Sequence, residues 1–215
     1  METLTQPEDP QVSWETQKDH LIKLKFHEYL NMTEEEYRAS LPDYQPQPEQ
    51  FKGRFNKPIL VDPRLRLLIQ FIRYQVGGYA TAIRKDTAKT KRLEELNPIQ
   101  HQPYQIWVDE GLKLQGLSED DAIKNFADDE RGLNIIEGLA LIREDHSLLN
   151  EHTVDLSGSR EVIRLPSGGT IENAPRFHKK PTLHHSNYQL TLHMVSPRFA
   201  AAKSIFPTCG VPKVT

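Results

Sequence analysis

The pattern of apolar and polar positions is most regular between residues 128 and 149, DDERGLNIIEGLALIREDHSLL. Apolar side chains recur there at intervals that cover most of the circumference of a helix, which is typical of a helix buried on all sides. They are Leu133, Ile135, Ile136, Leu139, Ala140 and Ile142. Asp128, Asp129 and Glu130 come first and favour the positive end of a helix dipole. The pattern predicts one long central helix, with cation binding or acid–base chemistry as the alternative role of the three acids.

The N-terminal pattern predicts a helical arm. Ser13 is the expected cap of a helix that runs to about Leu30. Its apolar stripe consists of Ile22, Phe26, Tyr29 and Leu30. Thr33 and Glu36 form a capping-box pattern at the start of a second, short helix, which Pro42 ends.

The segment 43–50, DYQPQPEQ, has prolines at alternate positions, which favour an extended linker. The sequence therefore divides into an arm with its linker, residues 1–50, and a domain, residues 51–215. The arm is expected to pack either on the domain or on a partner.

Short strands and helices are predicted within the domain. Apolar runs bounded by turn residues predict strands at Pro58–Val61 and Tyr104–Asp109. Asp62 and Pro63 favour the start of a helix that Gly77 and Gly78 close, and Ser118 with Asp121 begins another. Beyond residue 152, short apolar runs alternate with glycine and proline, and the clearest strand is Tyr188–Val195. We expect a single α+β domain with an antiparallel C-terminal sheet.

Composition and charge indicate the compartment in which the protein is expected. Apolar residues make up 37% and charged residues 27% of the 215 positions, and the formal net charge is −3. Successive segments carry −7, +7, −7 and +4 for residues 1–50, 51–100, 101–150 and 151–215. The N-terminus lacks the features of a secretory signal, no apolar run reaches the roughly 18 residues of a membrane helix, and Cys209 is the single cysteine. We therefore expect a cytoplasmic protein without a membrane partner.

Four of the nine histidines, His178, His184, His185 and His193, fall close together near the C-terminus. A two-residue hairpin turn at Ser186–Asn187 would place His178 opposite Val195 and make His178 and His193 diagonal neighbours on one face. These two, with Glu172, form the predicted metal site of an alternative function, a metal-dependent hydrolase. A structural role of the histidines is favoured because zinc sites need three or four ligands.

A second alternative function is nucleic-acid binding through the basic segment 84–92. Its cations are Arg84, Lys85, Lys89, Lys91 and Arg92. Solvated charge is the commoner explanation of such a run, and the overall balance is acidic.

Other candidate groups give little indication of chemistry. Cys209 lacks a sequence neighbour that would activate it, and Ser157–Ser159 lacks the pattern of a nucleophile elbow. Asp109 and Glu110, near Trp107, lie at a strand end, where open sheets often place functional groups. No cofactor-binding motif is found in the sequence, so no cofactor is predicted.

The order YQIWVDEG, then LNIIEGLALIREDHSLLNEH, then LSGSR resembles a family of uncharacterised bacterial proteins. The matching positions are Glu137, Gly138, Leu139, Ala140, Leu141, Gly158, Ser159 and Arg160. The resemblance implies a bacterial, cytoplasmic protein with an α+β body, and it implies no reaction.

The leading hypothesis is a non-catalytic interaction or small-ligand-binding protein. The chain has many packing signals and no catalytic constellation. A protein partner or a second copy of the chain would bind to the arm, Ser13–Leu41, and to the segregated charges.

Overall fold

The structure, a computed structural model, describes residues 10–67, 69–70, 80–81, 93–96, 100–167, 169–181, 188–195, 198 and 202–211. At positions 10, 80–81, 93–95, 174, 177–181 and 188–195 it describes the backbone. Among the described residues, no helix is both long and apolar enough to cross a membrane.

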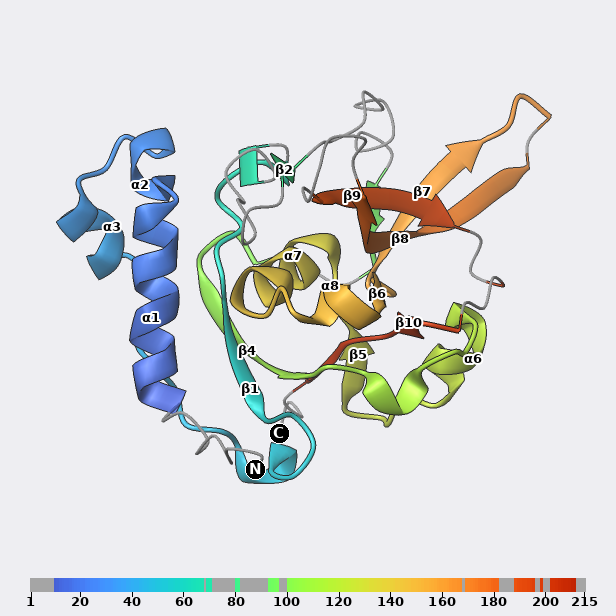
Figure 1. Ribbon diagram of the computed structural model, residues 1–215, viewed down its shortest axis with the longest axis horizontal. Coiled ribbons are helices and arrows are strands. Elements are labelled where there is room, and N and C mark those ends of the chain that lie inside the picture. Colours follow the sequence, from blue (N-terminus) through green and yellow to red (C-terminus); the bar gives the residue numbers. More distant parts are fainter. Residues whose placement is uncertain are drawn as a thin grey trace.

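Two sheets and several short helices build the protein (Figure 1). The helices are α1 (Pro10–Lys23), α2 (Phe26–Tyr29), α3 (Glu34–Ala39), α6 (Glu119–Lys124), α7 (Ile135–Glu144) and α8 (Leu148–Glu151), with 3-10 turns η1 (Glu49–Phe51) and η2 (Leu112–Leu114). The strands are β1 (Lys57–Val61), β2 (Ala80–Thr81), β3 (Leu93–Glu95), β4 (Tyr104–Asp109), β5 (Glu130–Gly132), β6 (Thr153–Asp155), β7 (Ser159–Arg164), β8 (Thr170–Pro181), β9 (Tyr188–Val195), β10 (Ser204–Ile205) and β11 (Thr208–Gly210). The predicted α+β class is confirmed.

The smaller sheet has the order β1-β4-β11-β5, and the larger one has the path β10-β6-β8-β7-β3, with β9 on β8 and β2 on β9. The pairs β7–β8 and β8–β9 are antiparallel, as predicted for the C-terminal third. In Figure 1, α1 lies on one side of β1 and β4, and α7 lies on the other. Because both faces of β1 are covered, Ile59, Leu60 and Val61 are all fully buried.

The central helix is shorter than the sequence predicts. Asn134, not the acids at 128–130, caps α7, and Glu137 completes a capping box with it. Glu130 instead begins β5, and the main chain of Leu133 bonds to Pro207 and Gly158. The prediction of one helix over 128–149 was wrong: Glu130 begins a strand, and Asp129 and Glu130 pair with Arg54 and Lys113 rather than with the helix end.

The N-terminal helices also differ from the prediction in detail. Helix α1 begins at Pro10, so Ser13 lies inside it, and it ends before Lys25, which has a left-handed φ of 61°. The predicted capping box of Thr33 and Glu36 is confirmed.

The arm packs on the domain. Trp14 and Leu21 are fully buried in the same cluster as Ile59 and Leu60. The Trp14 indole donates to the carbonyl of Pro42, so the start of the extended segment is bound as well. The apolar side of α1 is therefore used within the chain.

Three predicted strands, Pro58–Val61, Tyr104–Asp109 and Tyr188–Val195, are confirmed, and so is the cap of α6 by Ser118. Asp62 does not start a helix: its carboxylate accepts from the main chain and side chain of Arg64, and helical residues begin at position 67. The predicted helix end at Gly77 and Gly78 lies outside the described residues.

Candidate functional site

The strand register changes the predicted histidine geometry. Pro181 pairs with Tyr188 and Val195 faces position 174 rather than His178, so the register expected from a turn at Ser186–Asn187 was wrong. His178 pairs with Thr191, and His193 pairs with Arg176, which leaves the two histidines diagonal on one face.

The structure does not bring Glu172 to these histidines. It lies six positions before His178 on β8, which is about 20 Å along a strand. Among the described residues, no group of three or more His, Cys, Asp or Glu side chains could hold a metal ion. The side chains of His178 and His193 and the whole basic segment 84–92 lie outside the described part, so the metal and nucleic-acid alternatives stay predictions.

Cys209 is fully buried on β11, and burial raises the pKa of its thiol to about 12. It stays protonated near neutral pH and is a poor nucleophile. The turn at 157–158 is structural: Ser159 accepts a hydrogen bond from the main chain of Ile135, and Arg160 forms a buried ion pair with Glu119.

Side chains seal one edge of the smaller sheet. The amide of Gln17, on α1, donates to the carbonyl of Pro58 at 2.8 Å and accepts from the N–H of Leu60 at 2.7 Å. Arg143, on α7, donates to the carbonyl of Leu60 at 2.7 Å. The outer edge of β1 is thus satisfied without a further strand, as proteins commonly arrange for exposed edges.

This arrangement also fixes the direction of the peptide groups in β4. Since the peptide groups of Leu60 point outward, its partner Gln105 must likewise direct its N–H and C=O away from β1. On that side the paired residues of β11 reach only Asp109 and Val108. The main chain of Gln105 therefore has no strand partner among the described residues.

A cavity lies beside this unpaired part of β4, and we call it the edge slot. Its volume is about 670 Å³, within the range of ligand sites. Its lining includes four consecutive residues of β4, Tyr104–Trp107. Since successive strand residues point to opposite faces, a cavity that contacts four in a row lies along the edge of the strand.

The walls of the edge slot are apolar and already ordered. The extended segment contributes Pro42, Pro46 and Pro48, and Phe51 contributes an aromatic ring. The side-chain amide of Gln105 accepts from the N–H of Gln45 at 2.8 Å and donates to its carbonyl at 2.7 Å, which holds this segment against β4.

Charged groups fix the other side of the edge slot. Arg131 donates through both terminal nitrogens to Glu137, at 2.8 and 2.6 Å, and the Tyr104 hydroxyl donates to the same carboxylate at 3.0 Å. The hydrogen bond and charge of Glu137 raise the pKa of Arg131, although burial opposes this, and burial beside Glu137 raises the pKa of Tyr104. Both groups keep their protons near neutral pH, so both continue to donate to Glu137 and Arg131 stays cationic.

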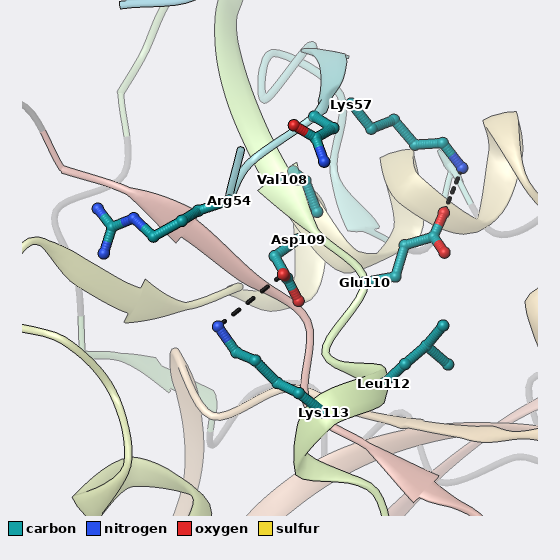
Figure 2. Close-up of a pocket in the computed structure, with 8 residues that line it drawn as sticks. Arg54, Lys57, Val108, Asp109, Glu110, Leu112 and Lys113 are labelled. Carbon is teal, nitrogen blue, oxygen red and sulfur yellow. Dashed lines mark hydrogen bonds and ion pairs between the residues drawn. The ribbon is translucent and has the colours of Figure 1, made fainter. Parts of the chain in front are cut away.

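A second cavity of about 370 Å³, which we call the charged cleft, lies at the other end of β4 (Figure 2). It is lined by Arg54, Asn56, Lys57, Val108, Asp109, Glu110, Leu112 and Lys113. The sequence had indicated Asp109 and Glu110 from their position at a strand end. Figure 2 shows their carboxylates turned apart, Glu110 toward Lys57 and Asp109 toward Lys113.

No protein-family model, curated protein or solved structure matches the chain. The resemblance of its second half to a family of uncharacterised bacterial proteins stays a prediction. The residues of that resemblance have structural roles here: Glu137 caps α7 and bonds to Arg131, and Arg160 binds Glu119.

Proposed function

We propose that the protein is an interaction protein that binds an extended peptide segment of a partner protein in the edge slot. The observation that carries the proposal is the contact of four consecutive β4 residues with one cavity, beside the peptide groups of Gln105, which have no strand partner in the described part of the chain. A peptide in strand conformation would exchange main-chain hydrogen bonds with Gln105 and extend the sheet, which is a recurring mode of peptide recognition.

The contrast between the two sheet edges supports this function. The outer edge of β1 is closed by Gln17 and Arg143, whereas the edge of β4 borders an open cavity with prolines and an aromatic ring on its walls. Two hydrogen bonds to Gln105 contribute about 1–3 kcal/mol together. Side chains of the peptide that contact Trp107, Phe51 and the prolines must supply the remaining affinity and the selectivity.

The cytoplasm of a bacterium is the setting that we propose. The buried, unpaired Cys209 suits a reducing compartment. The partner is a different protein, and binding requires no reaction.

Selection from a random library of displayed 12-residue peptides tests the proposal, followed by titration calorimetry of the recovered peptides. Gln105→Pro removes the N–H that faces the edge slot and leaves the bonds to β1, so we expect it to abolish binding. Gln105→Ala keeps that N–H and is the matched control for losing the side-chain bonds to Gln45.

The peptide provides a second test that needs no change to the protein. Methylation of its main-chain nitrogens, one at a time, should abolish binding at the one position whose N–H donates to the carbonyl of Gln105, and its neighbours should tolerate methylation because successive N–H groups of a strand face opposite sides. Uniform tolerance of methylation, or equal binding by Gln105→Pro, contradicts the proposal, as does recovery of no peptide. If the protein dimerises in the absence of peptide and the dimer recovers no peptide, a second copy of the chain occupies the edge slot. That result contradicts the proposal that the partner is a different protein.

A further inference from the structure

The charged cleft is separate from the edge slot, because the two cavities share no lining residue. It is formed where β4 ends and where residues 54–57 enter β1, so its walls come from two segments far apart in the sequence (Figure 2). A ligand in the charged cleft would therefore contact none of the residues that line the edge slot.

Two of its cations are held tightly by carboxylates. Lys57 lies 2.6 Å from Glu110 and 2.6 Å from Asp145, and these hydrogen bonds raise the pKa of the amine, although burial opposes this. Arg54 lies 2.6 Å from Asp129. These contacts join β1, β4 and the end of α7, and they are structural.

Asp109 and Lys113 are held more loosely. One carboxylate oxygen of Asp109 accepts from the N–H of Gly111 at 2.7 Å, but the other lies 3.9 Å from the Lys113 amine, beyond hydrogen-bond distance. Lys113 lies 3.4 Å from Glu130, and its side chain is 48% exposed. The pair of Asp109 with the exposed Lys113 amine contributes about 0–1 kcal/mol, so separating these two charges costs little, and Lys113 can keep its contact with the buried carboxylate of Glu130.

An anion and a cation that lie 3.9 Å apart on the cleft wall match a ligand that carries both charges close together. The ammonium of such a ligand would complete the hydrogen bonding of Asp109, and its carboxylate would bind Lys113, which exchanges one loose contact for two close ones. Leu112, 48% exposed, lines the same cleft and offers an apolar surface. An apolar ligand side chain would cover it.

We propose that the charged cleft binds a free α-amino acid with an apolar side chain, with its ammonium group on Asp109 and its carboxylate on Lys113. Asn56, at the exposed rim, adds an amide that can donate to the ligand carboxylate or accept from its ammonium group. This proposal is independent of peptide binding in the edge slot.

Titration calorimetry of the full chain with L-leucine tests it, with N-acetyl-L-leucine and L-leucine amide as probes that lack one charge each. We expect leucine to bind and each capped form to bind at least tenfold more weakly. Asp109→Asn and Lys113→Gln should each weaken leucine binding by a similar factor. Glycine should bind more weakly than leucine because it leaves Leu112 exposed.

Matched controls are available on α6. Asp120 lies 3.9 Å from Arg198, the same separation as in the Asp109 pair, and Lys124 is an exposed lysine paired with Asp121. Neither lines the cleft, so Asp120→Asn and Lys124→Gln should bind leucine as the parent does. No heat of binding up to about 10 mM leucine, equal binding of the capped forms, or unchanged binding by Asp109→Asn overturns the proposal. Gln105→Pro should retain leucine binding, so the two proposals can fail separately.

Discussion

Substitution of Gln17 by methionine should strongly destabilise the protein, although methionine has nearly the same length and fits an apolar site. Gln17 is 2% exposed and satisfies the carbonyl of Pro58 and the N–H of Leu60. Methionine offers neither partner, so both main-chain groups stay buried without a hydrogen bond. Each such group costs about 1–3 kcal/mol, so we expect a loss of about 2–6 kcal/mol from the free energy of unfolding. That is a large part of the roughly 5–15 kcal/mol typical of a domain.

Urea denaturation at equilibrium measures this loss, and hydrogen exchange of the Leu60 amide locates it. Gln115→Met is the matched control, because the Gln115 side chain is exposed and makes one hydrogen bond to a carbonyl, that of Ala202. It should change the free energy of unfolding by no more than about 0.5 kcal/mol. A Gln17→Met protein as stable as the control, with the Leu60 amide equally protected, refutes the reasoning that the amide completes the edge of β1.

Two further substitutions test the packing of α7 and a buried charge. Gly138→Ala places a Cβ atom 2.1 Å from a methyl of Leu156. The variant should therefore lose about 1–3 kcal/mol from the free energy of unfolding, measured by urea denaturation, despite the better helix propensity of alanine. A variant more stable than the parent contradicts this prediction. Burial raises the pKa of Glu119 to about 7, against the opposing charge of Arg160. The folded state therefore holds this proton more tightly than the unfolded state does. The resulting contribution of Glu119 to stability is complete below about pH 4.5 and is lost as the pH rises through about 7. Between about pH 4.5 and pH 7, the parent should lose up to about 3 kcal/mol of its free energy of unfolding relative to Glu119→Gln. A difference in urea midpoint between the two proteins that does not change with pH contradicts this prediction.

Local signals in the sequence predicted local structure well. The strand at Tyr104–Asp109 and the capping box of Thr33 and Glu36 depend on neighbours within a few residues, and both are confirmed. The helix expected from Asp128 failed for the opposite reason. Asp129 pairs with Arg54, 75 positions earlier, and such a contact leaves no trace in the periodicity.

The candidate sites were predictable only in part. The position of Asp109 and Glu110 at a strand end indicated that functional groups could lie there, since chain order alone places them at the end of a sheet, but it did not predict the other walls of the charged cleft. The edge slot depends on where β11 stops beside β4, and at that end Phe51 packs closely on Gly210, where a Cβ atom would lie 2.5 Å from the ring. A pairing between residues so distant in sequence cannot be inferred from either segment alone.

Gln17 and Gln105 both lie at the smaller sheet, and they show why residue type alone does not predict which strand edge is hydrogen-bonded. Gln17 follows Trp14 by three positions and precedes Leu21 by four, so helical spacing does place it on the buried face, and a polar residue there needs a main-chain partner. Gln105 gives no such indication, because its side chain binds Gln45 while its main chain faces the edge slot. The side-chain amide of Gln17 takes the place of a neighbouring strand at β1, whereas the side-chain amide of Gln105 holds the segment at Gln45 against β4. Only the register distinguishes the β1 edge that side chains close from the part of β4 that borders the edge slot.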